Sequence, residues 1–112
     1  MATPGLNVFA RFKAKRGMED RVRAALVDMI DPTLQEAANI GYALHQSATD
    51  PTLFLLYEQW DGKPGLENHM SQPYFATMEQ RLDGALETPM EVIEAHMIGG
   101  ETSPAAAGSA TS

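Results

Sequence analysis

The chain has 112 residues, of which 44% are hydrophobic and 21% charged, with a formal net charge of −7 and no cysteine. These values are typical of one globular domain, and they exclude disulfides, thiolate nucleophiles and thiolate metal sites. Most basic residues fall near the N-terminus, but the overall acidity argues against a nucleic-acid surface. No apolar run reaches membrane-spanning length and no signal peptide is recognisable, so we expect a cytoplasmic protein.

The first predicted element is a strand over residues 6–15, because apolar and polar side chains alternate there. A helix is predicted from about Met18, and Asp31-Pro32 interrupts it. Because proline lacks a backbone N–H, we expect a kink or a restarted helix with Asp31 as its cap. The apolar stripe of this helix comprises Val22, Leu26, Met29, Ile30, Leu34 and Ala37.

A second strand is predicted over 39–46, and a turn over 47–51 joins it to a third strand over 52–60. In the second strand His45 lies opposite the face shared by Ile40, Tyr42 and Leu44. The third strand is apolar on both faces, and one layer of helices covers only one of them. We therefore predict that a second subunit covers the other face.

After this strand the chain is expected to turn at Asp61-Gly62 and Pro64-Gly65, with a short helical turn over 66–70. A longer helix begins at Pro73, carries Phe75, Met78, Leu82 and Leu86 as its stripe, and is ended by Pro89. The last predicted strand covers 90–98. Residues 99–112 are small and polar and are expected to be a disordered tail, which leaves one domain over 1–98.

The order strand, helix, strand, strand, helix, strand predicts an α+β, ferredoxin-like βαββαβ fold. Its sheet has four antiparallel strands, with both helices on one face.

Three stretches together resemble the antibiotic biosynthesis monooxygenase family: VFARFKAKRG, the run EAANIGYALHQSATDP over 36–51, and residues 54–75, in which Tyr-Glu-x-Trp precedes a helix with a histidine. The resemblance covers about residues 6 to 98. It implies a homodimeric α/β barrel that oxidises a small phenol, quinol or polyphenol with molecular oxygen. Several members of the family need no metal, flavin or haem.

One branch of this family degrades haem with an asparagine, a tryptophan and a histidine. Trp60 and His69 match two of these positions, but alignment on Gly17 places Ala10 at the asparagine position. Asn7 lies three residues earlier and points to the opposite sheet face. We therefore expect no haem binding or degradation. Other relatives isomerise small phosphorylated diketones, so membership predicts the fold better than the reaction.

The candidate site lies where the third strand meets the following helix. His69 is the candidate base, because an unperturbed histidine pKa of about 6.5 suits proton removal near neutrality. Trp60 is a candidate wall that stacks on a planar substrate, and Asn68 is a candidate donor to a developing oxyanion. The alternatives are a helix-surface histidine, a core tryptophan and an exposed asparagine.

Four more residues are candidates for the substrate pocket. Glu58 shares a strand face with Trp60, and it either orients His69 or, as we favour, pairs with a basic residue such as Arg81. The remaining pocket candidates are Tyr74, Phe75 and His45. Core packing is the alternative for Phe75, and His45 matches a family position but lies on the other strand face.

Metal and cofactor sites are not predicted, because the three histidines are dispersed and no nucleotide-binding motif occurs. The main hypothesis is a cytosolic, homodimeric, cofactor-independent monooxygenase that acts on an aromatic quinol or polyphenol. The alternatives are a non-catalytic dimeric binding or stress-response module, and a small-molecule isomerase that uses His69 as acid and base. Neither a nucleic acid nor a membrane is expected as a partner.

Overall fold

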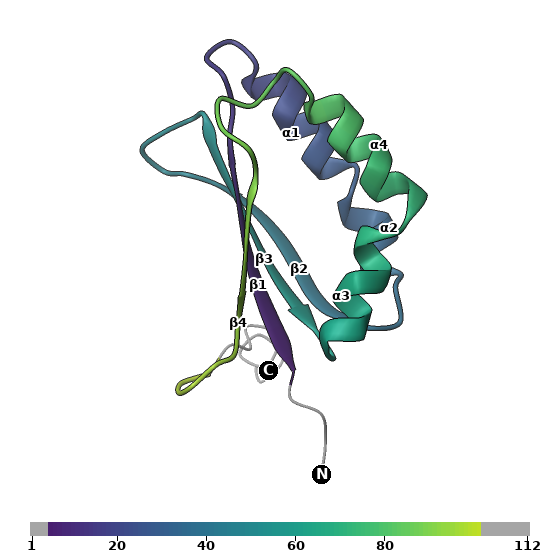
Figure 1. The fold of residues 1–112 in the computed structure, drawn as a ribbon. Coiled ribbons are helices and arrows are strands. Elements are labelled where there is room, and N and C mark those ends of the chain that lie inside the picture. The colour runs from purple at the N-terminus through teal and green to yellow at the C-terminus, as the bar shows by residue number, and fades with distance from the viewer. Residues whose placement is uncertain (1–4, 102–112) are drawn as a thin grey trace, which may run out of the picture.

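The computed structural model describes residues 5–101 and contains one four-stranded antiparallel sheet with its helices on one face (Figure 1). The sheet order is β2-β3-β1-β4, which confirms the predicted α+β ferredoxin-like fold. The elements are β1 (Leu6–Lys13), α1 (Glu19–Val27), α2 (Ile30–Leu34), β2 (Asn39–Gln46), β3 (Leu53–Trp60), α3 (Lys63–Met70), α4 (Pro73–Leu82) and β4 (Glu91–Ala95). Most of the predicted tail, residues 102–112, lies outside the described part, and no described helix is long and apolar enough to cross a membrane.

Strand β1 lies at the centre of the sheet, between β3 and β4. Its side chains alternate as predicted, and Val8, Ala10 and Phe12 are buried beneath the helices. The strand ends at Lys13, two residues before the predicted end, and Ala14 then forms an isolated bridge with Leu86. This alternation gives β1 one face toward the helices and one face away from them.

The predicted break in the first helix is present, but it differs in detail. The helix restarts at Ile30, so Asp31 lies within the first turn of α2 and is not its cap. Pro32 is tolerated there because the first N–H groups of a helix have no intrahelical acceptor. Leu34 was predicted to belong to the buried stripe, but it is 48% exposed because the short α2 does not continue the face of α1.

Strand β2 has the predicted bounds, and Tyr42 is buried against the core. Ile40 was predicted to share its buried face, but Ile40 is 64% exposed. The pairing of β2 with β3 shifts register between Asn39 and Gly41, and this irregularity turns Ile40 outward.

Helix α3 begins at Lys63, earlier than predicted, and Pro64 and Gly65 lie in its first turn rather than in a preceding turn. A Cβ atom on Gly65 would lie 2.6 Å from the Cβ of Ala38, so glycine permits a close approach between α3 and the loop before β2. Helix α4 begins at Pro73 as predicted but ends at Leu82, before Gly84 takes a left-handed φ of 78°. The last strand is also shorter than predicted.

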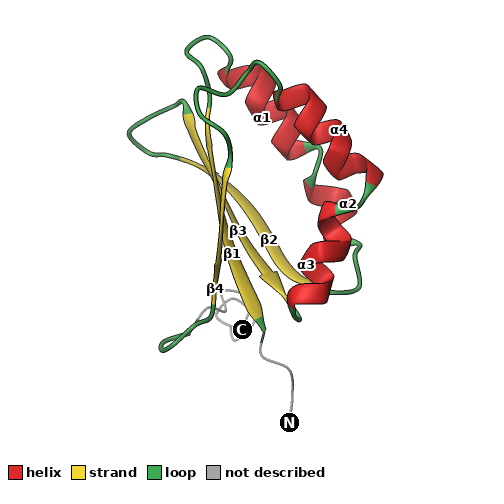
Figure 2. Ribbon diagram, in the orientation of Figure 1, coloured by secondary structure: helices red, strands yellow, loops and turns green. Residues whose placement is uncertain are grey.

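No described helix covers the second face of the sheet (Figure 2). Apolar side chains gather there, with Phe9 48% exposed and Ile93 52% exposed. The rings of Phe9 and Tyr57 stack with their centroids 5.1 Å apart. Together with Leu55 and His45, these residues line a groove of about 370 Å³, which we call the open-face groove.

Candidate active site

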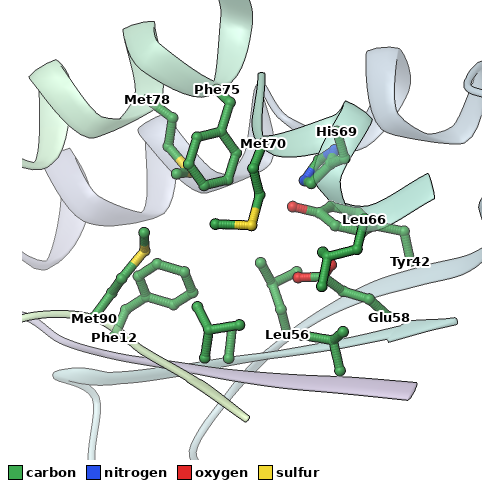
Figure 3. A pocket seen from close by; sticks show the side chains of 13 residues that line it. Phe12, Tyr42, Leu56, Glu58, Leu66, His69, Met70, Phe75, Met78 and Met90 are labelled. Carbon is green, nitrogen blue, oxygen red and sulfur yellow. The ribbon is translucent and has the colours of Figure 1, made fainter. Parts of the chain in front are cut away.

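A small cavity lies between the sheet and helices α3 and α4 (Figure 3). Its volume is about 20 Å³, room for roughly one water molecule. Its polar side chains, Tyr42, Glu58 and His69, gather at one end, and Phe12, Met78 and Met90 lie at the other. No lysine or arginine of the described residues lines the cavity. It is therefore an apolar site with its hydrogen-bonding groups at one end.

His69 is the most buried polar group at this end, with only 1% of its surface exposed. Its ring packs against Trp60 at 4.8 Å between centroids and edge-on against Phe75 at 5.4 Å. The ring nitrogen Nδ1 lies 2.8 Å from Oε2 of Glu36. His69 is therefore a fixed part of the interior and not a helix-surface residue.

Glu36 reaches this histidine from the loop between α2 and β2. Its side chain is only 9% exposed. The hydroxyl of Tyr74 donates to the same carboxylate oxygen, and within the described residues Oε1 has no hydrogen-bond partner. Burial, together with the bond to Glu36, raises the pKa of Tyr74, so it remains a neutral phenol that donates.

Glu58 is 5% exposed and accepts a hydrogen bond of 2.9 Å from the indole nitrogen of Trp60. Burial raises the pKa of Glu58 to about 7, although the bond from Trp60 opposes this shift. The predicted pairing with Arg81 is wrong, because Arg81 lies on α4 and bonds to Asp28 at 2.7 Å. Glu58 is thus a carboxyl group that changes charge near neutral pH inside the cavity.

Tyr42 completes the polar end of the cavity from strand β2. Burial, with the nearby carboxyl of Glu58, raises the pKa of Tyr42 far above its ordinary value. Its hydroxyl therefore stays protonated and can donate a hydrogen bond to a bound oxygen atom.

The predicted site residues divide into three groups. His69, Glu58 and Phe75 line the cavity. Trp60 and Tyr74 do not line it but hold the residues that do, since Trp60 packs on His69 and donates to Glu58, and Tyr74 bonds to Glu36. The third group lies away from the cavity and consists of Asn68 and His45.

Asn68 is exposed on the outside of α3, where its side-chain oxygen accepts a bond of 3.3 Å from Gln72. Consecutive residues of a helix point about 100° apart, so Asn68 does not share the inward direction of the buried His69. His45 lines the open-face groove on the far side of the sheet. The structure therefore does not bring these two predicted residues to the cavity.

Sequence reasoning missed Glu36 and the methionines that line the cavity, Met70, Met78 and Met90. Glu36 lies in an irregular loop 33 residues before His69, so no local pattern marks it. The methionines occupy apolar helix or loop positions that are equally typical of core packing. Within residues 5–101, no group of three or more histidine or acidic side chains is arranged to hold a metal ion.

Comparison with known proteins connects this chain to a family. The model of the family described as antibiotic biosynthesis monooxygenase matches residues 6–81. PA3566 from Pseudomonas aeruginosa has a similar structure, with a TM-score of 0.83 and 23% identity over 88% of this chain and 99% of that one. Rv0793 from Mycobacterium tuberculosis is similar with a TM-score of 0.81 and 24% sequence identity, over 88% of this chain and 99% of that one.

These two likenesses, each below 25% identity, show the fold alone. No curated protein matches the chain. The family model, however, spans well over half of the sequence, including β1, the helices α1 to α3 and nearly all of α4. The protein therefore belongs to the antibiotic biosynthesis monooxygenase family.

Proposed function

We propose that the protein is a homodimeric monooxygenase that oxidises a small, uncharged aromatic quinol or polyphenol with molecular oxygen and without a cofactor. The observation that carries this proposal is the buried His69 at the wall of an apolar cavity, with one ring nitrogen held by Glu36. A histidine in this position can take a proton from a bound hydroxyl group while the surrounding apolar side chains exclude water.

The chemistry follows from the spin state of oxygen, which reacts slowly with closed-shell molecules. His69 first takes a proton, leaving an electron-rich substrate anion. The anion gives one electron to oxygen, and the resulting radical and superoxide join at a ring carbon that carries hydrogen. The proton returns from His69 to the new peroxide, which loses water to leave a carbonyl. One oxygen atom is thus in the product and the other in water.

The lining of the cavity favours an uncharged substrate. It contains the carboxyl group of Glu58 and no lysine or arginine of the described residues. A phosphate or carboxylate on the substrate would be buried there without a cationic partner, which is strongly unfavourable. This argues against the isomerase alternative that acts on phosphorylated diketones. Tyr42 and the protonated form of Glu58 instead offer hydrogen bonds to neutral hydroxyl or carbonyl oxygens.

The proposed homodimer is supported by the open-face groove. Phe9 and Ile93 are about half exposed there, beside Leu55 and Tyr57. An apolar sheet face of this kind is typically covered by a second layer. A second copy of the chain would supply that layer and complete the barrel.

The test is oxygen consumption with a panel of neutral quinols, naphthols and anthrones, with ¹⁸O₂ labelling of the product. One labelled atom per product is expected. His69→Gln should lower kcat by roughly 10²–10⁴, the usual contribution of a positioned base. His96→Gln is the matched control, because His96 is exposed and, within the described residues, its ring bonds to the carbonyl of Gly5, and neither residue lines the cavity.

Absence of oxygen uptake above autoxidation across the panel would favour the non-catalytic binding module. Unchanged kcat in His69→Gln, on a substrate that the protein demonstrably oxidises, would remove His69 from the mechanism.

A further inference from the structure

We propose that Glu36 is a positioning residue, which holds the proton of His69 on Nδ1 and so leaves the lone pair of Nε2 available to the cavity. The inference rests on the proposed function only in assigning the lone pair to a substrate proton. The position of the proton on the ring is a separate, measurable property.

The argument starts from the two contacts at Oε2 of Glu36. This oxygen lies 2.8 Å from Nδ1 of His69 and also accepts the hydroxyl of Tyr74. Tyr74 is a neutral phenol, since its pKa is raised, so its proton points to the carboxylate. A carboxylate oxygen has no proton of its own, so it can only accept hydrogen bonds, from the second partner as from the first. Nδ1 must therefore be the donor.

A neutral imidazole carries one N–H, so a proton on Nδ1 leaves Nε2 as the basic nitrogen. Within the described residues Nδ1 is the hydrogen-bonded ring nitrogen. His69 also lines the cavity. Without an acceptor at Nδ1, an imidazole is free to carry its proton on Nε2, where it could not accept one from a substrate.

Burial makes this one contact decisive. His69 and Glu36 are both shielded from water, with side-chain exposures of 2% and 9%. A charge-assisted hydrogen bond in such surroundings is stronger than one at the surface, because water does not compete for either partner. The other polar groups around the ring come from β2, β3 and α4, namely Tyr42, Glu58 and Tyr74. None of them hydrogen-bonds to the ring in the described structure.

The backbone is built to allow this contact. Gly65 lies one helical turn before His69 on α3, and it faces Ala38 in the loop that carries Glu36. A Cβ at position 65 would approach that of Ala38 to 2.6 Å. The absence of a side chain at Gly65 therefore brings the helix close enough for His69 to reach Glu36.

The test is the tautomer of His69, read from the side-chain ¹H–¹⁵N spectrum of uniformly labelled protein at mildly alkaline pH. The signal that is missing from the spectrum of His69→Gln is the signal of His69, and His45 and His96 supply the signals that remain. The wild type is expected to carry the proton on Nδ1, whereas an exposed histidine prefers Nε2. Glu36→Leu should move the proton of His69 to Nε2, and Glu67→Leu, an exposed glutamate on the same helix, should not.

A wild-type spectrum with the proton on Nε2 would overturn the proposal by itself, even if Glu36→Leu fails to fold. A Glu36→Leu protein that folds and keeps the proton on Nδ1 would do the same. Glu36→Gln keeps an acceptor oxygen at nearly the same position and should retain the wild-type tautomer.

The kinetic arm uses the same variants on an oxidised quinol. Glu36→Leu removes the group that fixes the tautomer of the base, so it should lower kcat by up to the contribution of that base, roughly 10²–10⁴. KM should change little because Glu36 does not line the cavity. A wild type that consumes no oxygen but carries its proton on Nδ1 contradicts the proposed function and leaves the positioning role intact. A wild type that consumes oxygen but carries the proton of His69 on Nε2 contradicts the positioning role of Glu36 and leaves the proposed oxidation intact.

Discussion

Trp60 donates its indole N–H to Glu58 across 2.9 Å, and both side chains lie on the helix-covered face of β3. They are two residues apart on a strand, so the bond needs no tertiary rearrangement. It stabilises the ionised form of Glu58, whereas burial favours the neutral form. The larger effect is burial, and the result is a pKa of about 7 for a carboxyl group inside the protein.

The first prediction is that this carboxyl group makes the wild type less stable as the pH rises. The folded pKa of Glu58, about 7, is above its ordinary value of 4.5. The folded state therefore holds the proton more tightly, and its contribution is full below about pH 4.5 and lost as the pH rises through about 7. Glutamine does not titrate, so the free energy of unfolding of Glu58→Gln, relative to that of the wild type, should rise by about 3 kcal/mol from pH 4.5 to above pH 7. Urea unfolding at constant protein concentration measures this difference.

Asp50 does not obscure that measurement. Its bonds to Lys13 and Thr52 lower the pKa of Asp50, so its contribution is lost only as the solution becomes strongly acidic. Glu67→Gln, at an exposed position, is the control for the change in net charge. A wild type and a Glu58→Gln variant with parallel pH profiles would contradict the prediction.

The second prediction concerns the donor in the same bond. Trp60→Phe keeps an aromatic ring in the core but removes the indole N–H. In the wild type the hydrogen bond from this N–H lowers the pKa of Glu58. In Trp60→Phe we expect the pKa of Glu58 to rise above 7. The stability of this variant should begin to fall at the same pH as that of the wild type and should continue to fall to a higher pH. The carboxyl stretching bands of ¹³C-glutamate-labelled protein would follow the titration directly. A pKa below that of the wild type would show that the bond is not what opposes burial.

The third prediction tests the close approach at Gly65. Gly65→Ala places a methyl group against Ala38, and overpacking of this kind costs roughly 1–3 kcal/mol of unfolding free energy. Helix α3 must move away from the loop, which lengthens the bond between His69 and Glu36. We therefore expect a lower kcat although no polar group has been removed.

Ala38→Gly in the Gly65→Ala background is the matched rescue, because it removes the methyl group that the new one meets. Stability and kcat should recover together in the double variant. Recovery of stability without kcat would indicate that the spacing of α3 does not control His69.

The fourth prediction concerns the open-face groove. Phe9→Arg places a charge in the proposed interface and should convert the dimer to a monomer in light scattering or sedimentation. Leu34→Arg is closely matched, because Leu34 is also 48% exposed but lies on α2, on the helical side of the sheet. It should leave the dimer unchanged. A wild type that is monomeric at micromolar concentration would contradict the assembly altogether.

The strands could be predicted because alternation specifies both the element and its buried face, as at Val8, Ala10 and Phe12. Departures occurred where a local backbone feature overrides alternation or periodicity. Ile40 turns outward at a shift of register, and Leu34 is exposed because the helix is divided into α1 and α2. Neither event has a clear signature in the residues themselves.

For the site, the sequence indicated His69 and Glu58 but assigned the wrong partner to Glu58. Arg81 was a reasonable choice by charge, yet burial of a carboxyl group can be met by protonation as well as by an ion pair. Glu36 was not predicted because its contact with His69 joins a loop to a helix across 33 residues. Such contacts depend on how the loop and the helix pack against each other, which local sequence patterns do not reveal.

The methionines that line the cavity bear on how the proposed substrate would be admitted. Met70 is 43% exposed at the edge, Met78 is buried, and only about 20 Å³ of the interior is unfilled. The proposed planar aromatic substrate would enter once these unbranched side chains change rotamer, which thioethers do readily. Binding then exchanges contacts within the protein for contacts with the ligand and releases little water from the cavity. Its heat-capacity change should therefore come mainly from dehydration of the ligand, and selection by size should be gradual rather than abrupt.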